Sequence, residues 1–337
     1  MKRLMALTVA LSLSLALLAG CGGAKTEKPA APATEQKAAA PAPAPAAPTP
    51  KKPDLLTVGF VPSQDAAGIE SKVKPMEDYL SKALGMPVKT FVGTNFVGVI
   101  EAMGSGKVDV GWLNPLGYVM ASGDYGAKVL LKSVRKGSAT YRAQLTVRAE
   151  DNIPVCDLAK DPKCAATFNA LKGKKLAFVD AASTSGYLFP ASFMKGAGVD
   201  IEKGKFFTDV IQAGQHDAAA KLVYNKGADA SWTFEDVRDN LLKELPDVKT
   251  KLIPVAYTNP IPNDTVSVRK DLPADFVDQI KKALLDFSQT EEGKKVLKDL
   301  YTIDGLVEGN DADYNVVRDM AKNMGVDIKG ELSKTKK

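Results

Sequence analysis

The stretch GKVDVGW (106–112) is nearly repeated as KGADASW (226–232), and this repeat organises the chain. In each copy an aspartate stands three residues before a tryptophan. Phe60 lies 49 positions before the first aspartate, and Phe178 lies 51 positions before the second. A chance match over seven residues is the alternative. However, the elements around the two copies also follow the same order, so the repeat predicts two similar lobes.

Apolar runs and helical spacing alternate along both halves of the chain, which is typical of βαβ units with parallel strands. Such lobes usually bind a ligand between them, outside the carboxyl ends of their strands. Two long segments, 141–150 and 251–269, are the expected crossings between the lobes, and two C-terminal helical segments, 274–299 and 312–324, are expected to pack on the first lobe. Strands are predicted at 57–61, 87–92, 107–112, 175–180, 206–211 and 227–232, with helices at 97–103 and 216–225.

The N-terminus has the pattern of an export signal. Lys2 and Arg3 precede an apolar run, 4–17, that is shorter than the roughly 20 residues needed to span a bilayer. The run ends in Leu-Ala-Gly-Cys, which resembles the lipobox of bacterial lipoproteins, so Cys21 is predicted to be lipidated and to become the first residue. An uncleaved signal anchor is the alternative.

The next segment, 24–53, is rich in proline and alanine and has no aromatic residue. It cannot bury enough apolar surface to fold, so it is predicted to be an extended tether between a membrane and the globular part. The predicted organisation is a signal peptide (1–20), a lipidated cysteine with its tether (21–53), a first lobe (54–145), a second lobe (146–255), a return to the first lobe (256–330) and a disordered tail (331–337).

Charge and cysteine content narrow the classes of function. The net charge of +5 falls to +3 once Lys2 and Arg3 are removed, which is too small a bias to indicate a nucleic-acid partner. Cys156 and Cys164 form an even pair in an exported chain and are expected to form a local disulfide. A metal site is the alternative, but it lacks a second cluster of ligands and the only histidine is far away in the sequence.

The segment VDAASTSGYLFP (179–190) places three hydroxyls between a predicted strand and a predicted helix. The first turn of a helix has unpaired N–H groups and the positive end of the helix dipole, so added hydroxyls form an anion site without a formal positive charge. Plain capping is the alternative, but it needs only one serine or threonine.

His216 opens a later helix, where the neutral imidazole is favoured and can still donate one hydrogen bond. An ordinary surface or core histidine is the alternative.

Three phrases, STSGYLFP, QAGQHDAA and PIPNDTVSVRKDLP, resemble the periplasmic phosphonate-binding proteins of the phosphate, phosphite and phosphonate importer family. DYLSKALG and GKVDVGWLNPLGYVMA agree with this resemblance, which covers about 55–290 in the same order. It implies a type II periplasmic-binding fold: two Rossmann-like α/β lobes joined by two crossing strands, with the ligand cleft between them. By resemblance, the ligand-binding role falls on Ser183, Thr184, Ser185, Gly186, His216, Tyr141 and Asp264.

The chain departs from the 2-aminoethylphosphonate binders of that family at two positions. Phe96 stands where they have a tyrosine, and Asp236 stands where they have a glutamate for the amine of the ligand. Specificity for an aminoalkyl group is therefore in doubt, whereas a tetrahedral oxyanion is the firmer expectation. Trp112 is a further candidate for the cleft, although a core position suits it equally.

Asp264, if the resemblance places it correctly, carries an argument about selectivity. A buried carboxylate repels an anion that brings no proton, so it should reject sulfate and accept a protonatable phosphorus oxyanion. A role as a turn residue in Pro-Asn-Asp is the alternative.

The sequence thus predicts a monomeric, lipid-anchored extracytoplasmic receptor that delivers a small phosphorus oxyanion to an ABC permease and its ATPase. No cofactor and no metal are expected. An enzyme is disfavoured because the G-x-S-x-G, P-loop and H-E-x-x-H motifs are absent from the sequence. A sulfonate receptor, or a sensor with the same fold, remains an alternative.

Overall fold

The computed structural model describes residues 50–326. The predicted signal peptide, Cys21, nearly all of the tether and the C-terminal tail therefore lie outside the described residues. Within 50–326, no helix is both long enough and apolar enough to cross a membrane.

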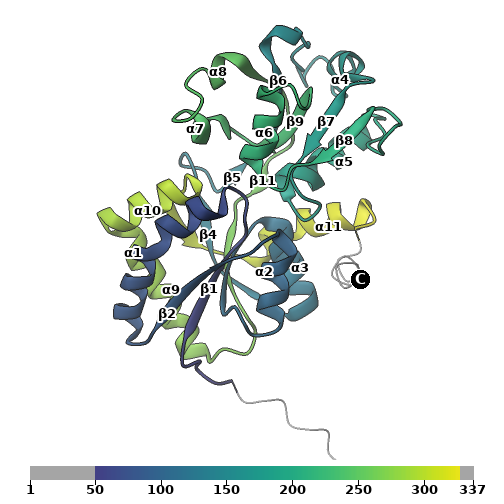
Figure 1. Cartoon of the computed structure of the whole chain (residues 1–337). Helices are drawn as coiled ribbons and strands as arrows, with labels where there is room; N and C mark the ends of the chain where they lie inside the picture. The colour runs from purple at the N-terminus through teal and green to yellow at the C-terminus, as the bar shows by residue number, and fades with distance from the viewer. Residues whose placement is uncertain (1–49, 327–337) are drawn as a thin grey trace, which may run out of the picture. The chain divides into compact units, whose positions relative to one another are not determined.

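The first lobe is built on a six-stranded mixed sheet with the order β13-β4-β12-β3-β1-β2 (Figure 1). β1 lies parallel to both β2 and β3, as the sequence predicts for a βαβ arrangement. β12 returns from the second lobe and runs antiparallel to β3 and β4. The strands are β1 (Leu56–Phe60), β2 (Val88–Val92), β3 (Val110–Leu113), β4 (Lys128–Val134), β12 (Thr265–Val268) and β13 (Gly305–Glu308).

The second lobe is built on a five-stranded mixed sheet with the order β10-β6-β9-β7-β8. β7 is parallel to β8 and β9, whereas β6 is antiparallel to β9 and β10. Between the two sheets, β5 (Thr140–Tyr141) and β11 (Ile261–Pro262) form a two-stranded antiparallel ribbon. The other strands are β6 (Ala143–Arg148), β7 (Lys175–Phe178), β8 (Asp209–Gln212), β9 (Ala230–Phe234) and β10 (Leu252–Tyr257). The two-lobe α/β fold predicted from the sequence is confirmed.

Helices cover both sheets, and their ends follow local sequence signals. The Asp65 side chain caps α1 by accepting a hydrogen bond from the Gly68 N–H, and Gly85 ends α1 in the left-handed conformation that glycine tolerates. α1 packs against α9 and α10 on one side of the first sheet, and α11 packs against α3 (Figure 1). The longer helices are α1 (Ala66–Leu84), α2 (Phe96–Gly104), α3 (Pro115–Tyr125), α5 (Phe189–Gly196), α6 (His216–Tyr224), α9 (Ala274–Gln289), α10 (Glu291–Tyr301) and α11 (Asn315–Asn323). The short ones are α4 (Ala165–Leu171), α7 (Arg238–Leu241) and α8 (Val248–Lys251).

The sequence repeat corresponds to a repeated structural unit. In the first lobe, Asp109 accepts hydrogen bonds from the Thr57 N–H (2.8 Å) and from Arg269 Nε (2.7 Å). In the second lobe, Asp229 accepts hydrogen bonds from the Lys175 N–H (2.8 Å) and from Arg148 (2.8 Å). Each aspartate thus ties the start of a neighbouring parallel strand, β1 or β7, to an arginine.

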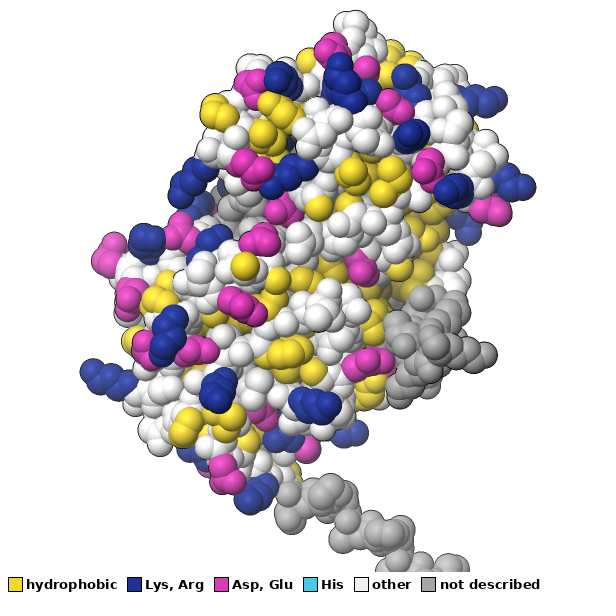
Figure 2. Space-filling model, in the orientation of Figure 1, with side chains coloured by type: hydrophobic (Ala, Val, Ile, Leu, Met, Phe, Trp, Pro, Cys, Tyr) yellow, Lys and Arg dark blue, Asp and Glu magenta, His cyan; other side chains and the backbone are white. Residues whose placement is uncertain are grey.

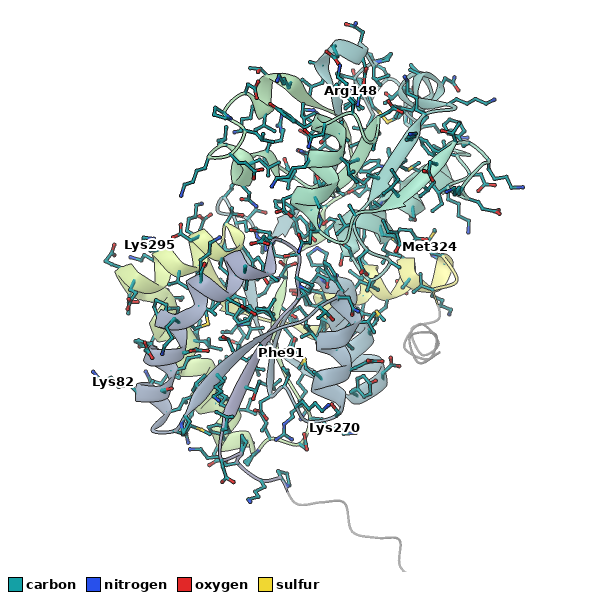
Figure 3. All side chains as sticks on the ribbon, viewed as in Figure 1. Lys82, Phe91, Arg148, Lys270, Lys295 and Met324 are labelled. Atoms are coloured by element: carbon teal, nitrogen blue, oxygen red, sulfur yellow. A yellow bond between two sulfur atoms is a disulfide. The ribbon has the colours of Figure 1, made fainter. Side chains whose placement is uncertain are left out.

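These two clusters serve the scaffold. Figure 3 shows Arg148 far from the β5–β11 ribbon, at the distant end of the second lobe. The two repeat tryptophans, Trp112 and Trp232, are both fully buried. The repeat therefore marks the framework of the lobes, and the site has to be sought at the opposite ends of the strands.

Some predicted elements differ from those observed. The segment 274–299, predicted as one helical stretch, is two helices, because Thr290 ends α9 and its side chain caps α10 by accepting from the Gly293 N–H. β4 and β13 were not predicted. Three predicted strands, 107–112, 206–211 and 227–232, begin three residues later as β3, β8 and β9.

Cys156 and Cys164 are bonded to each other in the structure, with their Cα atoms 5.1 Å apart. The bond closes the loop that precedes α4. No group of three or more metal-ligating side chains lies within residues 50–326.

On the face shown in Figure 2, lysines and arginines are mixed with aspartates and glutamates over both lobes. This even distribution agrees with the small net charge of +5. No histidine is visible on this face, in line with the burial of His216.

Candidate functional site

A small, partly open cavity of about 30 Å³ lies between the two lobes, next to the β5–β11 ribbon. A site of roughly 10–15 Å³ on this measure holds one water molecule, so the cavity in this closed arrangement admits a small solute only. Its walls come from loops at the carboxyl ends of strands and from the first residues of helices. The lining residues are Val61, Ser63, Gln64, Phe96, Asn114, Arg135, Tyr141, Ser183, Ser185, His216, Phe234, Asp264 and Tyr301.

Two hydroxyls of the Ser-Thr-Ser run line this cavity. Ser183 precedes a π-helical turn (Thr184–Leu188), and its Oγ accepts a hydrogen bond from the Gly186 N–H (3.1 Å). Ser185 Oγ accepts a hydrogen bond from the Tyr141 hydroxyl (3.3 Å). Within the described chain neither serine hydroxyl has an acceptor for its own proton. Both are therefore available to donate to an anion in the cavity.

His216 presents one defined donor to the same space. Its Nδ1 accepts a hydrogen bond from the Phe234 N–H (3.1 Å), so the proton of the neutral ring is on Nε2. Nε2 lies 3.5 Å from Ser183 Oγ. Burial, with a smaller contribution from the charge of Arg135, lowers the pKa of His216 to about 3. The imidazole is therefore neutral at physiological pH and acts as an N–H donor without a net charge.

The first lobe contributes an ion pair. Arg135, directly after β4, places an Nη atom 2.5 Å from Asp264 Oδ2. Its Nε donates to the Tyr301 carbonyl (2.9 Å), and its other Nη is 3.3 Å from the side-chain oxygen of Asn263. Burial opposes the charge of the guanidinium, but the Asp264 carboxylate holds the pKa of Arg135 above its usual value. Asp264 is thus not the isolated carboxylate that the sequence argument assumed, because a cation neutralises it.

Thr184, the middle residue of the run, does not line the cavity. Its Oγ1 accepts hydrogen bonds from the Asn114 side-chain amide (2.9 Å) and from the Leu116 N–H (2.8 Å), both in the first lobe. Leu116 is in the first turn of α3, so a residue of the second lobe caps a helix of the first. The Asn114 amide also donates to the Ala182 carbonyl (2.8 Å). The turn that carries the serines is in this way joined to both lobes.

Three further candidates lie outside the cavity. A side chain at Gly186 would collide with Val179, whose Cβ would be only 2.4 Å from the added Cβ, so close packing requires glycine there. Trp112 is in the core of the first lobe, stacked on Phe60 with ring centroids 5.8 Å apart. Asp236 lines a larger neighbouring pocket of about 540 Å³ and is paired with Lys136 (2.6 Å) and Arg238 (3.0 Å).

The structure therefore brings six of the ten sequence-predicted ligand residues to one cavity: Ser183, Ser185, His216, Tyr141, Asp264 and Phe96. Sequence reasoning missed Arg135, Asn114 and Tyr301, which also line it. Arg135 and Asn114 each directly follow a strand of the first sheet, β4 and β3. For Asn114, the position just after a predicted strand was an available signal, whereas no such signal existed for Arg135 because β4 was not predicted. Tyr301 ends α10, which no sequence pattern places at the cleft.

A fold of two hinged α/β lobes, with hydrogen-bond donors from both lobes around a closed cavity, is typical of proteins that bind a small solute and release it. A family model described as the periplasmic substrate-binding protein of a phosphonate ABC transporter matches residues 58–314. The chain belongs to this family.

Curated relatives and a solved structure agree with this assignment. The chain is 29% identical to the phosphate-import protein PhnD of Mycolicibacterium smegmatis, with 79% of this chain and 84% of that protein covered. It is 28% identical to the phosphonates-binding periplasmic protein of Escherichia coli, with 73% and 70% covered. The structure of PhnD1 from Prochlorococcus marinus in complex with methylphosphonate has the same fold, with a TM-score of 0.72 at 22% identity, covering 81% of this chain and 99% of that one.

Proposed function

We propose that this protein is a lipid-anchored receptor that closes its two lobes on a small phosphorus oxyanion, such as phosphite, phosphate or a phosphonate, for delivery to an ABC permease. The observation that carries the proposal is the set of uncharged donors around the cavity: the Ser183 and Ser185 hydroxyls and the Nε2–H of His216. The family membership and the names of the relatives support the same class of ligand.

The donors suit an oxyanion because two parts of the second lobe, the turn after β7 and the start of α6, direct them to one cavity. The Tyr141 hydroxyl, in the β5–β11 ribbon, donates to Ser185 and so leaves the Ser185 proton available. Hydrogen bonds from neutral groups to a charged ligand each contribute about 1.5–3 kcal/mol. Several such bonds in a mostly buried space give strong binding without any chemical reaction, in keeping with a transport role.

Asp264 supplies the proposed selectivity. One of its oxygens is bound to Arg135, and the other has no hydrogen bond within residues 50–326, so it can accept a proton carried by the ligand. A protonated phosphorus oxyanion brings such a proton, whereas sulfate brings none near neutral pH. Sulfate would leave an unsatisfied acceptor facing its own charge, which is the penalty that selects against it.

The aminoalkyl phosphonates are the less suitable ligands. Asp236 is the residue proposed by resemblance to hold an amine, but both its oxygens are engaged, by Lys136 and by Arg238. An incoming ammonium group would have to displace Lys136. We therefore expect small phosphorus oxyanions without an amine to bind more tightly than 2-aminoethylphosphonate.

Isothermal titration calorimetry tests the proposal directly. The soluble chain from residue 50 onward is titrated with phosphate, phosphite, methylphosphonate, 2-aminoethylphosphonate and sulfate. Binding of at least one of the first three, and at least about a hundredfold weaker binding of sulfate, is expected, because one unsatisfied buried charge costs several kcal/mol. Tighter binding of sulfate than of every phosphorus compound would refute the proposal. The lipid anchor is tested separately, by whether Cys21→Ala releases the full-length protein from membranes.

A further inference from the structure

We propose that Arg135 is a specificity-determining residue of the anion cavity, acting by neutralising Asp264 so that this carboxylate can remain next to a bound anion. The inference rests on the proposed function, since it concerns the same phosphorus oxyanion. It adds a residue that lies outside the Ser-Thr-Ser run and the histidine, on the opposite lobe.

The geometry shows that the pair is part of the cavity wall. Both Arg135 and Asp264 line the cavity, and the ion pair between them is 2.5 Å long. The side chains are about one fifth exposed, at 17% and 21%. The Arg135 guanidinium also lies against the Tyr141 ring, 5.6 Å from its centroid. Its position is therefore fixed from several sides before any ligand arrives.

The hydrogen bonds of the guanidinium leave it with donors to spare. A guanidinium has five N–H groups. Those of Arg135 bond the Tyr301 carbonyl, the Asn263 side chain and Asp264, one each. Two N–H groups thus have no acceptor among residues 50–326. Arg135 can hold Asp264 and still face an anion.

The charges in the cavity then balance for one class of ligand. His216 is neutral, and Arg135 and Asp264 cancel each other, so the side chains that line the cavity have no net charge. A phosphorus oxyanion in its monoanionic form adds one negative charge and brings a proton for the free oxygen of Asp264. Without Arg135 the same ligand would meet an unpaired carboxylate, a repulsion that is strong at short range in a poorly solvated site.

Alternative roles for Arg135 are less well supported. A purely structural ion pair would not need to line the cavity or to keep two free donors. Arg142 provides a comparison within the same chain: it pairs with Glu235 through two hydrogen bonds (2.7 and 3.1 Å), and it does not line the anion cavity. It is therefore a matched control for removing an arginine from an ion pair.

The test compares four proteins by calorimetry with phosphite and sulfate: the unaltered chain, Arg135→Gln, the double variant Arg135→Gln with Asp264→Asn, and the control Arg142→Gln. We expect Arg135→Gln to lose at least about thirtyfold in phosphite affinity, because it leaves a buried carboxylate unpaired beside the anion. The double variant should bind phosphite within about tenfold of the unaltered chain and should no longer reject sulfate. Arg142→Gln should bind phosphite as the unaltered chain does.

Each outcome decides between the possibilities. If Arg135→Gln binds phosphite as tightly as the unaltered chain does, the inference about Arg135 is wrong, while the proposed function still stands. If Arg135→Gln fails to fold, as judged by circular dichroism, the double variant decides: recovery of phosphite binding with loss of discrimination against sulfate supports the inference, and absence of phosphite binding overturns it. If the unaltered chain binds no phosphorus oxyanion, the proposed function fails as well, and the two failures are thereby distinguished.

Discussion

The two lobes share one framework but supply different chemistry to the cavity between them. α2 and α6 are equivalent helices of nine residues, and the first residue of each lines the cavity. That residue is Phe96 in the first lobe and His216 in the second. The first lobe thus contributes an apolar ring where the second contributes a hydrogen-bond donor.

The same contrast holds at the other positions around the cavity. The second lobe supplies neutral donors, Ser183, Ser185 and His216, whereas the first supplies the charged pair of Arg135 and Asp264. The Asp109 and Asp229 clusters, by comparison, are nearly the same in the two lobes. The amino ends of β1 and β7 thus carry the shared framework, whereas the residues at the carboxyl ends of the strands differ between the two lobes.

The largest expected effect concerns the neutral donors of the second lobe. Ser183→Ala combined with Ser185→Ala should weaken phosphite binding by more than about a hundredfold, because two hydrogen bonds to a charged ligand are lost. Ser267→Ala is the control, since Ser267 is a buried serine of the first sheet, bonded to Thr265 and outside the cavity. It should leave the affinity unchanged, as measured by calorimetry. Undiminished binding by the double variant would show that the two serines do not hold the anion.

The repeated framework predicts a smaller effect, on folding stability. Asp109→Asn should lower the free energy of unfolding by about 2–3 kcal/mol, because it breaks a buried ion pair with Arg269. Asp229→Asn should cost less, about 1 kcal/mol, because its side chain is 27% exposed whereas that of Asp109 is 4% exposed. Urea denaturation followed by circular dichroism measures both values. Equal losses of stability would contradict the ranking by burial, and a change in phosphite affinity would contradict the separation of framework and site.

The smallest expected effect is the dependence of stability on pH that His216, in the second lobe, contributes. His216 has a pKa of about 3 in the folded protein and about 6.5 when unfolded. The unfolded chain therefore takes up a proton that the folded chain does not. The stabilisation is fully present above pH 6.5 and is lost progressively as the pH falls towards 3.

His216→Gln removes this term and isolates it from the titration of the carboxylates. Between pH 5.5 and 4.5, the unaltered chain should lose about 1 kcal/mol more stability than His216→Gln does. Urea denaturation at the two pH values provides the measurement. Parallel loss in the two proteins would mean that the imidazole is charged in the folded state, and hence that its Nδ1 does not accept from the Phe234 N–H.

Much of the fold follows from local signals in the sequence. The alternating apolar runs predicted β1, β2 and β7, and the order of elements around the repeat predicted two lobes. β4 and β13 were missed because their pairing partners, β12 and each other, come from distant parts of the chain. The residue pattern within each of these strands does not reveal this long-range pairing. Thr290 divides a helical segment because its side chain is an effective cap, a signal that the periodicity of the segment hides.

Site residues that are neighbours in the sequence were easier to predict than site residues that come together only through long-range strand pairing. Ser183 and Ser185 follow a strand directly, and their position predicted a donor role. Arg135 meets Asp264 only because β4 and β12 are neighbours in the first sheet, although 129 positions separate the two residues. Trp112 was a candidate for the cleft, with a core position as the alternative, and its side chain lies in the core and stacks on Phe60.

The position of Thr184 has a consequence for how a solute leaves the protein. Its hydroxyl oxygen accepts from Asn114 and Leu116, so the turn that carries the two serines is held to the opposite lobe through the first turn of α3. Parting of the lobes would break these bonds at the same time as it withdraws the serines from the solute. Release of the solute would therefore coincide with loss of the hydrogen bond to the first turn of α3. A membrane transporter that separates the lobes would break both sets of contacts in one step.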